Sequence, residues 1–185
     1  MLNTIIGEHS YVERGFRILW NKPDTLGNNI NPKLVIGKYC SIAENLTVYL
    51  GGNHPMNYMT TSSLHFRLLK DSNVSWREHL SSGDVVIGND VWIGDNVVIM
   101  SGSTINDGAV IGAYSVVRST ILPYSINFGN PARYIRKRFS YDIETKLIEM
   151  QWWDWNIDKI KESVHLLESE DINGLYDYYL KNIKV

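Results

Sequence analysis

An aliphatic residue recurs at every sixth position along residues 86–117. This period is neither the 3.6 residues of a helix nor the 2 of an isolated strand. It suits a chain that turns a corner every six residues, so that three short strands close a triangular coil of about eighteen residues. The six positions are Ile87, Ile93, Ile99, Ile105, Ile111 and Val117.

The residues between these positions support the same geometry. A smaller or β-branched residue stands four places after each of the first five aliphatic residues: Val91, Val97, Ser103, Ala109 and Ser115. We expect the aliphatic side chains to stack inside the prism, while neighbouring coils pair as parallel strands. Because Gly and Asn accept a positive φ most cheaply, we expect that conformation at the corner residues. These are Gly88, Asn89, Gly94, Asn96 and Gly112.

A clean copy of the repeat precedes this run, and a weak copy precedes that one. Ile36, Ile42 and Val48 lie six apart, and Cys40 stands where a small buried side chain fits. Residues 1–30 predict an irregular first coil with a loop insertion. The pattern as a whole predicts an all-β solenoid over residues 1–139.

The six-residue register fails over residues 49–85. This stretch is polar and contains His54, His65 and His79. A solenoid tolerates such an excursion because each coil contacts only its neighbours. Long irregular loops of this kind are more often functional than accidental, so we expect the chemistry here.

After the main run, turns at Pro123 and Pro131 are expected to lead the chain out of the solenoid. Residues 140–185 have helical spacing, with Ser140 and Asn156 as expected N-caps. The three tryptophans of Trp152–Trp155 are expected to pack these helices onto the prism or onto a neighbouring subunit. The predicted inward residues are Ile143, Leu147, Ile148, Ile157, Ile160, Val164, Leu167, Ile172, Leu175 and Tyr179.

Composition narrows the class of protein. The chain has 185 residues, 44% of them hydrophobic, and a net charge of −2, which excludes a disordered or generally basic chain. It shows no signal-peptide pattern and no apolar run long enough to cross a membrane. Cys40 is the only cysteine, so an internal disulfide is excluded and we expect a cytoplasmic protein.

Several motifs together resemble one family. They are IGKYCSIAENL (36–46), GGNHPMNYMTT (51–61), IGNDVWIGDNVVIMSG (87–102), FGNPARYIRKRF (128–139) and WWDWNIDKI (152–160). The chain resembles the hexapeptide-repeat acyltransferases, in the xenobiotic acetyltransferase branch with the streptogramin A and chloramphenicol enzymes and many sugar O-acetyltransferases. The resemblance implies a left-handed parallel β-helix with a C-terminal helical extension, a homotrimer, and acetyl-CoA as co-substrate without a metal.

The resemblance also assigns roles to residues. The histidine of the GNH element, here His54, is implied to be the general base, and a neutral imidazole suits proton removal from a hydroxyl near neutral pH. The implied acetyl-CoA contacts are Trp92, Asp95, Ala113, Arg118, Arg133 and Arg136. Guanidinium groups suit the phosphates of CoA. The implied acceptor contacts are Asn53, Tyr58 and Thr60.

The sequence does not identify the acceptor. We expect an O-acetyltransferase acting on a surface polysaccharide or its precursor, with an antibiotic or an amino sugar as alternatives. The loop segment TTSSLHF (60–66) lacks the proline typical of the branch, so the substrate is not assumed to be an antibiotic. Zinc chemistry is disfavoured because residues 86–117 contain no histidine. A non-catalytic scaffold would need neither His54 nor the basic exit segment, and one short basic cluster does not predict nucleic-acid binding.

Overall fold

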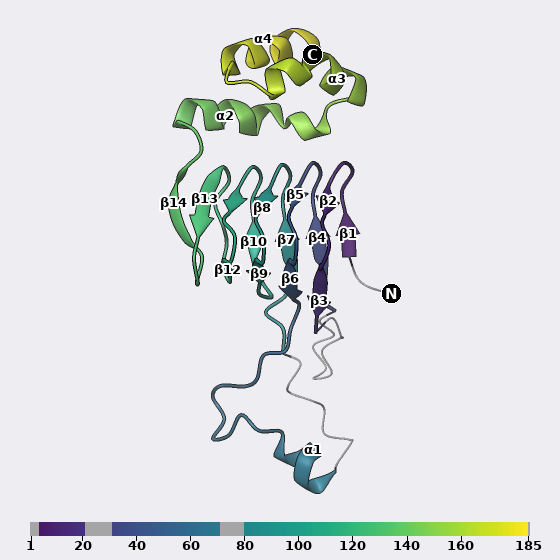
Figure 1. The fold of residues 1–185 in the computed structure, drawn as a ribbon, viewed down its shortest axis with the longest axis vertical. Helices are drawn as coiled ribbons and strands as arrows, with labels where there is room; N and C mark the ends of the chain where they lie inside the picture. Colours follow the sequence, from purple (N-terminus) through teal and green to yellow (C-terminus); the bar gives the residue numbers. More distant parts are fainter. Residues whose placement is uncertain (1–3, 21–30, 71–79, 185) are drawn as a thin grey trace. The chain divides into compact units, whose positions relative to one another are not determined.

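The computed structural model describes residues 4–20, 31–70 and 80–184 of the chain. The chain divides into two compact units, Met1–Arg136 and Lys137–Val185. The first unit contains the strands, except that the last strand ends at Lys137, and the second contains the C-terminal helices (Figure 1).

Short strands of the first unit pass through three sheets in strict rotation. The order of strands is β1-β4-β7-β10 in one sheet, β2-β5-β8-β11 in the second and β3-β6-β9-β12 in the third, with β13 and β14 added beside β11. We call one passage through the three sheets a coil. The strands are β1 (Thr4–Ile6), β2 (Tyr11–Val12), β3 (Arg17–Leu19), β4 (Leu34–Ile36), β5 (Ser41–Ile42), β6 (Thr47–Tyr49), β7 (Val85–Ile87), β8 (Trp92–Ile93), β9 (Val98–Ile99), β10 (Thr104–Ile105), β11 (Val110–Ile111), β12 (Val116–Val117), β13 (Ser125–Phe128) and β14 (Arg133–Lys137).

The predicted interior is confirmed. All six aliphatic residues of the main run, and all five of the smaller residues between them, are at most 1% exposed. The coils stack in parallel register, which places Ile36 beside Ile87, Ile42 beside Ile93 and Val48 beside Ile99. Each fully buried aliphatic side chain contributes about 1.5–3 kcal/mol of transfer free energy, so the stack itself holds the coils together.

The predicted corner conformations are wrong for Gly88, Asn89, Gly94 and Gly112, and confirmed for Asn96. The left-handed residue stands three places after each aliphatic residue, as in Asp90 (φ 54°), Asn96 (φ 56°) and Tyr114 (φ 61°).

The glycines that directly follow the aliphatic residues are needed for lack of space and not for a positive φ. A Cβ on Gly94 would lie 2.7 Å from the backbone nitrogen of Ala113, and one on Gly37 would lie 2.5 Å from the carbonyl oxygen of Gly88. These glycines therefore permit the close approach of one coil to the next.

Both ends of the solenoid are more regular than expected. The first coil is in full register with the second, since Thr4 to Ile6 pair with Leu34 to Ile36. The expected exit at Pro123 is also wrong, because Ile121 bridges Ile105 and β13 pairs with β11. The buried Asn127 takes the inward position beside Ile111, and its side-chain amide donates to the Ser125 hydroxyl. That hydrogen bond satisfies a polar group in a place where the other coils bury aliphatic residues.

The excursion between β6 and β7 contains a short helix that the sequence pattern does not predict, α1 (Leu64–Leu69). Hydrogen bonds join the two ends of the excursion. The Asn53 amide donates to the Leu80 carbonyl at 3.0 Å, and the Ser81 hydroxyl donates to the Leu50 carbonyl at 2.5 Å. Residues 71–79 lie outside the described part of the chain.

The second unit consists of α2 (Tyr141–Met150), the 3-10 turn η2 (Trp152–Asp154), α3 (Ile157–Leu167) and α4 (Ile172–Asn182). Asn156 caps α3 as predicted, whereas the Ser140 side chain makes no capping hydrogen bond. Ile148, Ile157 and Val164 are exposed, contrary to the predicted faces.

The aromatic residue Trp155 explains this difference, because it stacks on Tyr179 and supplies part of the core that these aliphatic residues were expected to form. None of the helices in the described ranges is long and apolar enough to span a bilayer.

Candidate functional site

His54 lies on the excursion, just after its first anchored residue, and its side chain is exposed. Its Nδ1 lies 2.8 Å from the backbone carbonyl oxygen of Thr61. A carbonyl oxygen only accepts hydrogen bonds, so Nδ1 carries the proton in this arrangement. In the neutral ring, Nε2 then keeps its lone pair and can accept a proton from a hydroxyl group.

The Trp20 indole lies against Gly52, in the turn that carries His54, and the sequence pattern does not predict this contact. Gly52 has a φ of 90°, and a Cβ at this residue would lie 2.8 to 2.9 Å from three adjacent atoms of the Trp20 indole. Trp20 ends the first coil, more than thirty positions before Gly52. At that separation no periodicity of the sequence predicts the contact. The two chain segments meet because the Leu50 amide donates to the Leu19 carbonyl at 2.9 Å.

The three predicted acceptor residues lie on the same excursion. Asn53 uses its backbone to hold the loop closed, and its side-chain amide lies 3.5 Å from the Ser82 hydroxyl. The Thr60 hydroxyl accepts from the Ser62 amide at 3.0 Å, which shapes the turn next to the Thr61 carbonyl. Tyr58 is exposed. Fold and hydrogen bonding therefore gather these residues on the loop that carries His54.

The loop also exposes apolar side chains. Met56 is 91% exposed and Leu68, on α1, is 72% exposed, and Met59, Leu64 and Leu69 are exposed as well. Exposed apolar surface is commonly found where a protein contacts another apolar group.

Asp95 and Ala113 lie at the corner from the second sheet to the third on two neighbouring coils, and Trp92 lies in the strand just before this corner. Trp92 projects from β8 and is 57% exposed. The Tyr114 amide donates to the Asp95 carbonyl at 2.8 Å, which brings Ala113 beside Asp95. The Asp95 carboxylate accepts from the Glu44 amide at 3.0 Å, so this side chain also links one coil to the preceding one.

Arg118 and Arg133 follow two backbone segments that are hydrogen-bonded to each other at the end of the solenoid. The Val116 amide donates to the Gly129 carbonyl at 2.9 Å, and the Val116 carbonyl accepts from the Ala132 amide at 2.8 Å. Arg118 follows Val116 by two residues, and Arg133 follows Ala132 directly. Both arginines and Arg136 are exposed, and Arg133 and Arg136 belong to the edge strand β14.

The fold separates His54 from Trp92 within one chain. The excursion leaves between β6 and β7, at the corner from the third sheet to the first. Trp92 precedes the corner from the second sheet to the third. The predicted base and the predicted tryptophan contact therefore belong to different corners of the coil.

Cys40, His65 and His79 have no role in the predicted site. Cys40 is fully buried, and burial raises the pKa of its thiol, which keeps it protonated and unreactive. His65 lies on α1, exposed, and His79 lies outside the described residues. Across residues 4–20, 31–70 and 80–184, no cluster of three His, Cys, Asp or Glu side chains is placed to hold a metal ion.

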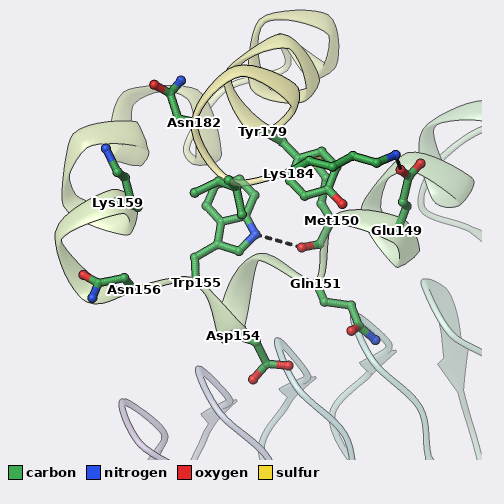
Figure 2. Close-up of a pocket in the computed structure, with 11 residues that line it drawn as sticks. Glu149, Met150, Gln151, Asp154, Trp155, Asn156, Lys159, Tyr179, Asn182 and Lys184 are labelled. Carbon is green, nitrogen blue, oxygen red and sulfur yellow. Dashed lines mark hydrogen bonds and ion pairs between the residues drawn. The ribbon is translucent and has the colours of Figure 1, made fainter.

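A shallow pocket of about 440 Å³ lies within the helical unit (Figure 2). Trp155 donates through Nε1 to the Met150 carbonyl at 2.8 Å, and Lys184 pairs with Glu149 at 2.7 Å. Hydrogen bonds from Lys184 and from Tyr176 lower the pKa of Glu149. None of the residues that line this pocket belongs to the predicted site.

Comparison with known proteins agrees with this architecture. Residues 84–119 match the family described as bacterial transferase hexapeptide (six repeats). The chain is 41% identical to the chloramphenicol acetyltransferase of Morganella morganii over 150 residues, which cover 80% of this chain and 71% of that protein. It is 37% identical to the virginiamycin A acetyltransferase of Staphylococcus aureus over 187 residues, covering 94% and 80% of the two chains.

Among solved structures, the fold is similar to the hexapeptide-repeat acetyltransferase VCA0836 of Vibrio cholerae, with a TM-score of 0.53 and 25% identity. The match covers 75% of this chain and 64% of that one. The chain belongs to the hexapeptide-repeat acetyltransferases, in the branch that contains the chloramphenicol and virginiamycin A enzymes. It is an acetyltransferase, as the motifs predict.

Proposed function

We propose that the chain transfers the acetyl group of acetyl-CoA directly to a hydroxyl group of a small acceptor, with His54 as the general base. The observation that carries this proposal is the hydrogen bond from Nδ1 of His54 to the Thr61 carbonyl, which leaves Nε2 unprotonated in the neutral ring. The left-handed hand of the β-helix is part of the proposal, by likeness to the family.

His54 Nε2 takes the hydroxyl proton as the acceptor oxygen attacks the acetyl carbonyl carbon, and it gives that proton to the departing CoA sulfur. The O–C bond forms, the C–S bond breaks, and the imidazole ends as it began. No acyl-enzyme is required, which is consistent with a buried, protonated Cys40. The Thr61 carbonyl stabilises the imidazolium during the transfer, because its negative dipole faces the Nδ1 proton.

Arg118, Arg133 and Arg136 are proposed to bind the phosphates of CoA. They are exposed on the last coil and the strand that follows it, and guanidinium groups pair with phosphate oxygens through two parallel hydrogen bonds. Trp92, Asp95 and Ala113 would line the path of the pantetheine arm at the neighbouring corner.

We propose a homotrimer with the site between subunits. Within one chain, the loop of His54 and the residue Trp92 leave different corners of the coil. Apolar side chains also stand exposed on the outer faces of two sheets, namely Ile5 and Val86 on one and Tyr11 and Trp92 on another. A second chain would cover these faces and bring its own corner to the loop.

For the acceptor, the loop favours a small molecule with an apolar body. Met56, Met59 and Leu68 expose apolar surface on the loop that carries His54, where a polysaccharide would need polar partners. The two antibiotic acetyltransferases named above match most of this chain, which supports the same acceptor class. A sugar of a surface polysaccharide remains the second candidate.

The first experiment measures CoA release from acetyl-CoA with chloramphenicol, virginiamycin A and a panel of oligosaccharides as acceptors. Release with an antibiotic and not with the sugars supports the apolar acceptor. Release with the sugars alone contradicts that acceptor class and leaves the acetyltransferase assignment intact.

The second experiment replaces the base. His54→Ala is expected to lower turnover by at least about 10²-fold, the usual range for general-base catalysis. His65→Ala, on α1 of the same loop, is the matched control and should keep the rate near that of the parent. Near-normal turnover by His54→Ala would exclude His54 as the base.

A further inference from the structure

Trp20 lies next to the loop that carries His54. Its φ is 58°, a left-handed value that other bulky residues of this chain share, such as Tyr39 and Tyr114. The contact of its side chain, and not its backbone conformation, sets it apart. Trp20 ends the first coil directly after β3, and 45% of its surface is exposed.

The Trp20 indole lies flat against the backbone of the loop. A Cβ placed on Gly52 would be 2.8 Å from Cγ, 2.8 Å from Cδ1 and 2.9 Å from Cδ2 of the ring. A point this far from three adjacent ring atoms, and nearly equidistant from them, lies over the face of the ring rather than at its edge. The Gly52 Cα therefore rests on the indole face, and only glycine fits there.

The contact acts on a segment that is anchored on both sides. Before Gly52, Leu50 donates its amide to the Leu19 carbonyl at 2.9 Å, which fixes the chain beside Trp20. After it, the Asn53 amide donates to Leu80 at 3.0 Å. His54 is the next residue, and its ring reaches the Thr61 carbonyl from this anchored turn.

We propose that Trp20 is a positioning residue for His54, an inference that rests on the proposed function. Its indole sets the height and direction of the Gly52 turn, and so decides whether Nδ1 reaches the Thr61 carbonyl. Without the ring, the turn sinks into the vacated space. The hydrogen bond that holds the proton on Nδ1 is then lost, and Nε2 is no longer kept free to act as the base.

The first test is spectroscopic and needs no acceptor. Nitrogen NMR of histidine-labelled protein reports which ring nitrogen of His54 is protonated, with the His54→Ala spectrum giving the assignment. In the parent we expect the Nδ1–H form, and in Trp20→Ala a mixture with the Nε2–H form. Trp20→Phe, which keeps a flat ring, should restore the parent spectrum. An unchanged His54 signal in Trp20→Ala would overturn the proposal.

The second test is kinetic and separates this proposal from the function on which it rests. Trp20→Ala should lower kcat by about tenfold or more, since small misplacements of a catalytic group cost up to about a hundredfold. The apparent KM for acetyl-CoA should not change. In the His54→Ala background, Trp20→Ala should have no further effect, because both changes remove the same contribution.

Each outcome of the kinetic test has one reading. If Trp20→Ala lowers the rate by the same factor in both backgrounds, or raises only the acceptor KM, Trp20 does not act through His54 and the inference fails. If His54→Ala itself keeps its activity, the proposed function fails, whatever Trp20→Ala does to the NMR spectrum.

A matched control separates positioning from stability. His9 also belongs to the first coil, has a φ of 61° and packs its ring on Tyr39, at a corner that does not carry the loop. His9→Ala should keep kcat and the His54 signal. Thermal unfolding of each variant shows whether it is folded under the assay conditions, and a fall in kcat of the same size in His9→Ala would contradict a specific role for Trp20.

Discussion

Two reactive side chains of this protein, Cys40 and His54, differ in what their positions allow. Cys40 lies inside a coil, donates weakly to the Gly88 carbonyl at 3.0 Å, and is kept protonated because burial raises the pKa of its thiol. His54 lies on the excursion with one nitrogen tied to a carbonyl and its side chain exposed. Only the second arrangement offers a lone pair to a substrate.

The arginines of the last coil give a prediction at the same scale. Arg133→Ala should chiefly raise the apparent KM for acetyl-CoA, by about tenfold, because one charge-assisted phosphate contact contributes about 1.5 kcal/mol or more. The measurement is steady-state kinetics at fixed acceptor and low salt.

Arg14→Ala is the control for Arg133→Ala, since Arg14 is an exposed arginine that pairs with Glu44 on the first two coils. It should leave the KM near that of the parent. An unchanged KM in Arg133→Ala would move the phosphate site elsewhere.

At the scale of the strands, each two-residue strand presents one side chain inward and the next outward. Ile99 is fully buried, and Val98, its neighbour on β9, is half-buried on the outer face. The period of six determines which of the two side chains is inward. Ile99 stacks on Val48 and on Val117, so three coils are joined through one sheet.

We therefore expect Ile99→Ala to lower the free energy of unfolding by about 2–5 kcal/mol, through lost transfer energy and the cavity that remains. Val98→Ala, one residue away in the same strand, should cost clearly less, because its side chain is only partly removed from water. Denaturant unfolding followed by circular dichroism measures both. Equal losses would mean that the inner stack does not dominate the stability of the coils.

At the scale of the whole molecule, the proposed site depends on more than one chain. The outer faces expose Ile5, Tyr11 and Trp92, and the loop of His54 leaves a corner different from that of Trp92. We therefore propose that the site is completed only when another chain packs against these faces.

The expected assembly is a trimer of 21.2 kDa chains in every active preparation. Analytical ultracentrifugation across a dilution series, with activity measured on the same samples, tests this. Activity should fall together with the trimer fraction, because the site would lose one of its walls on dissociation. A fully active monomer would contradict a site between subunits.

The sequence alone predicted the inner stack, since a strict period of six leaves few other ways to bury Ile87, Ile93 and Ile99. The resemblance of its motifs indicated the family to which the chain belongs. The sequence also placed His54 in the segment where that period fails. The inner stack and the family are confirmed because inward positions and sequence motifs are local properties of the chain, and the role of His54 stays a prediction.

Only the tertiary structure assigned the glycines to close contact between coils and the positive φ values to residues such as Asp90 and Tyr114. It also showed that β13 continues the sheet beyond Pro123. These features depend on which residue of the next coil lies opposite, and the sequence of a single repeat does not determine that.

The contact of Trp20 with Gly52 has the same origin. More than thirty residues separate the two in the sequence, and no pattern links them. They meet because β3 and β6 pair side by side, and that pairing places the end of the first coil against the turn before His54. The periodicity of the sequence determined the coil. The stacking of the first coil on the second decided which side chain lies against the turn before His54.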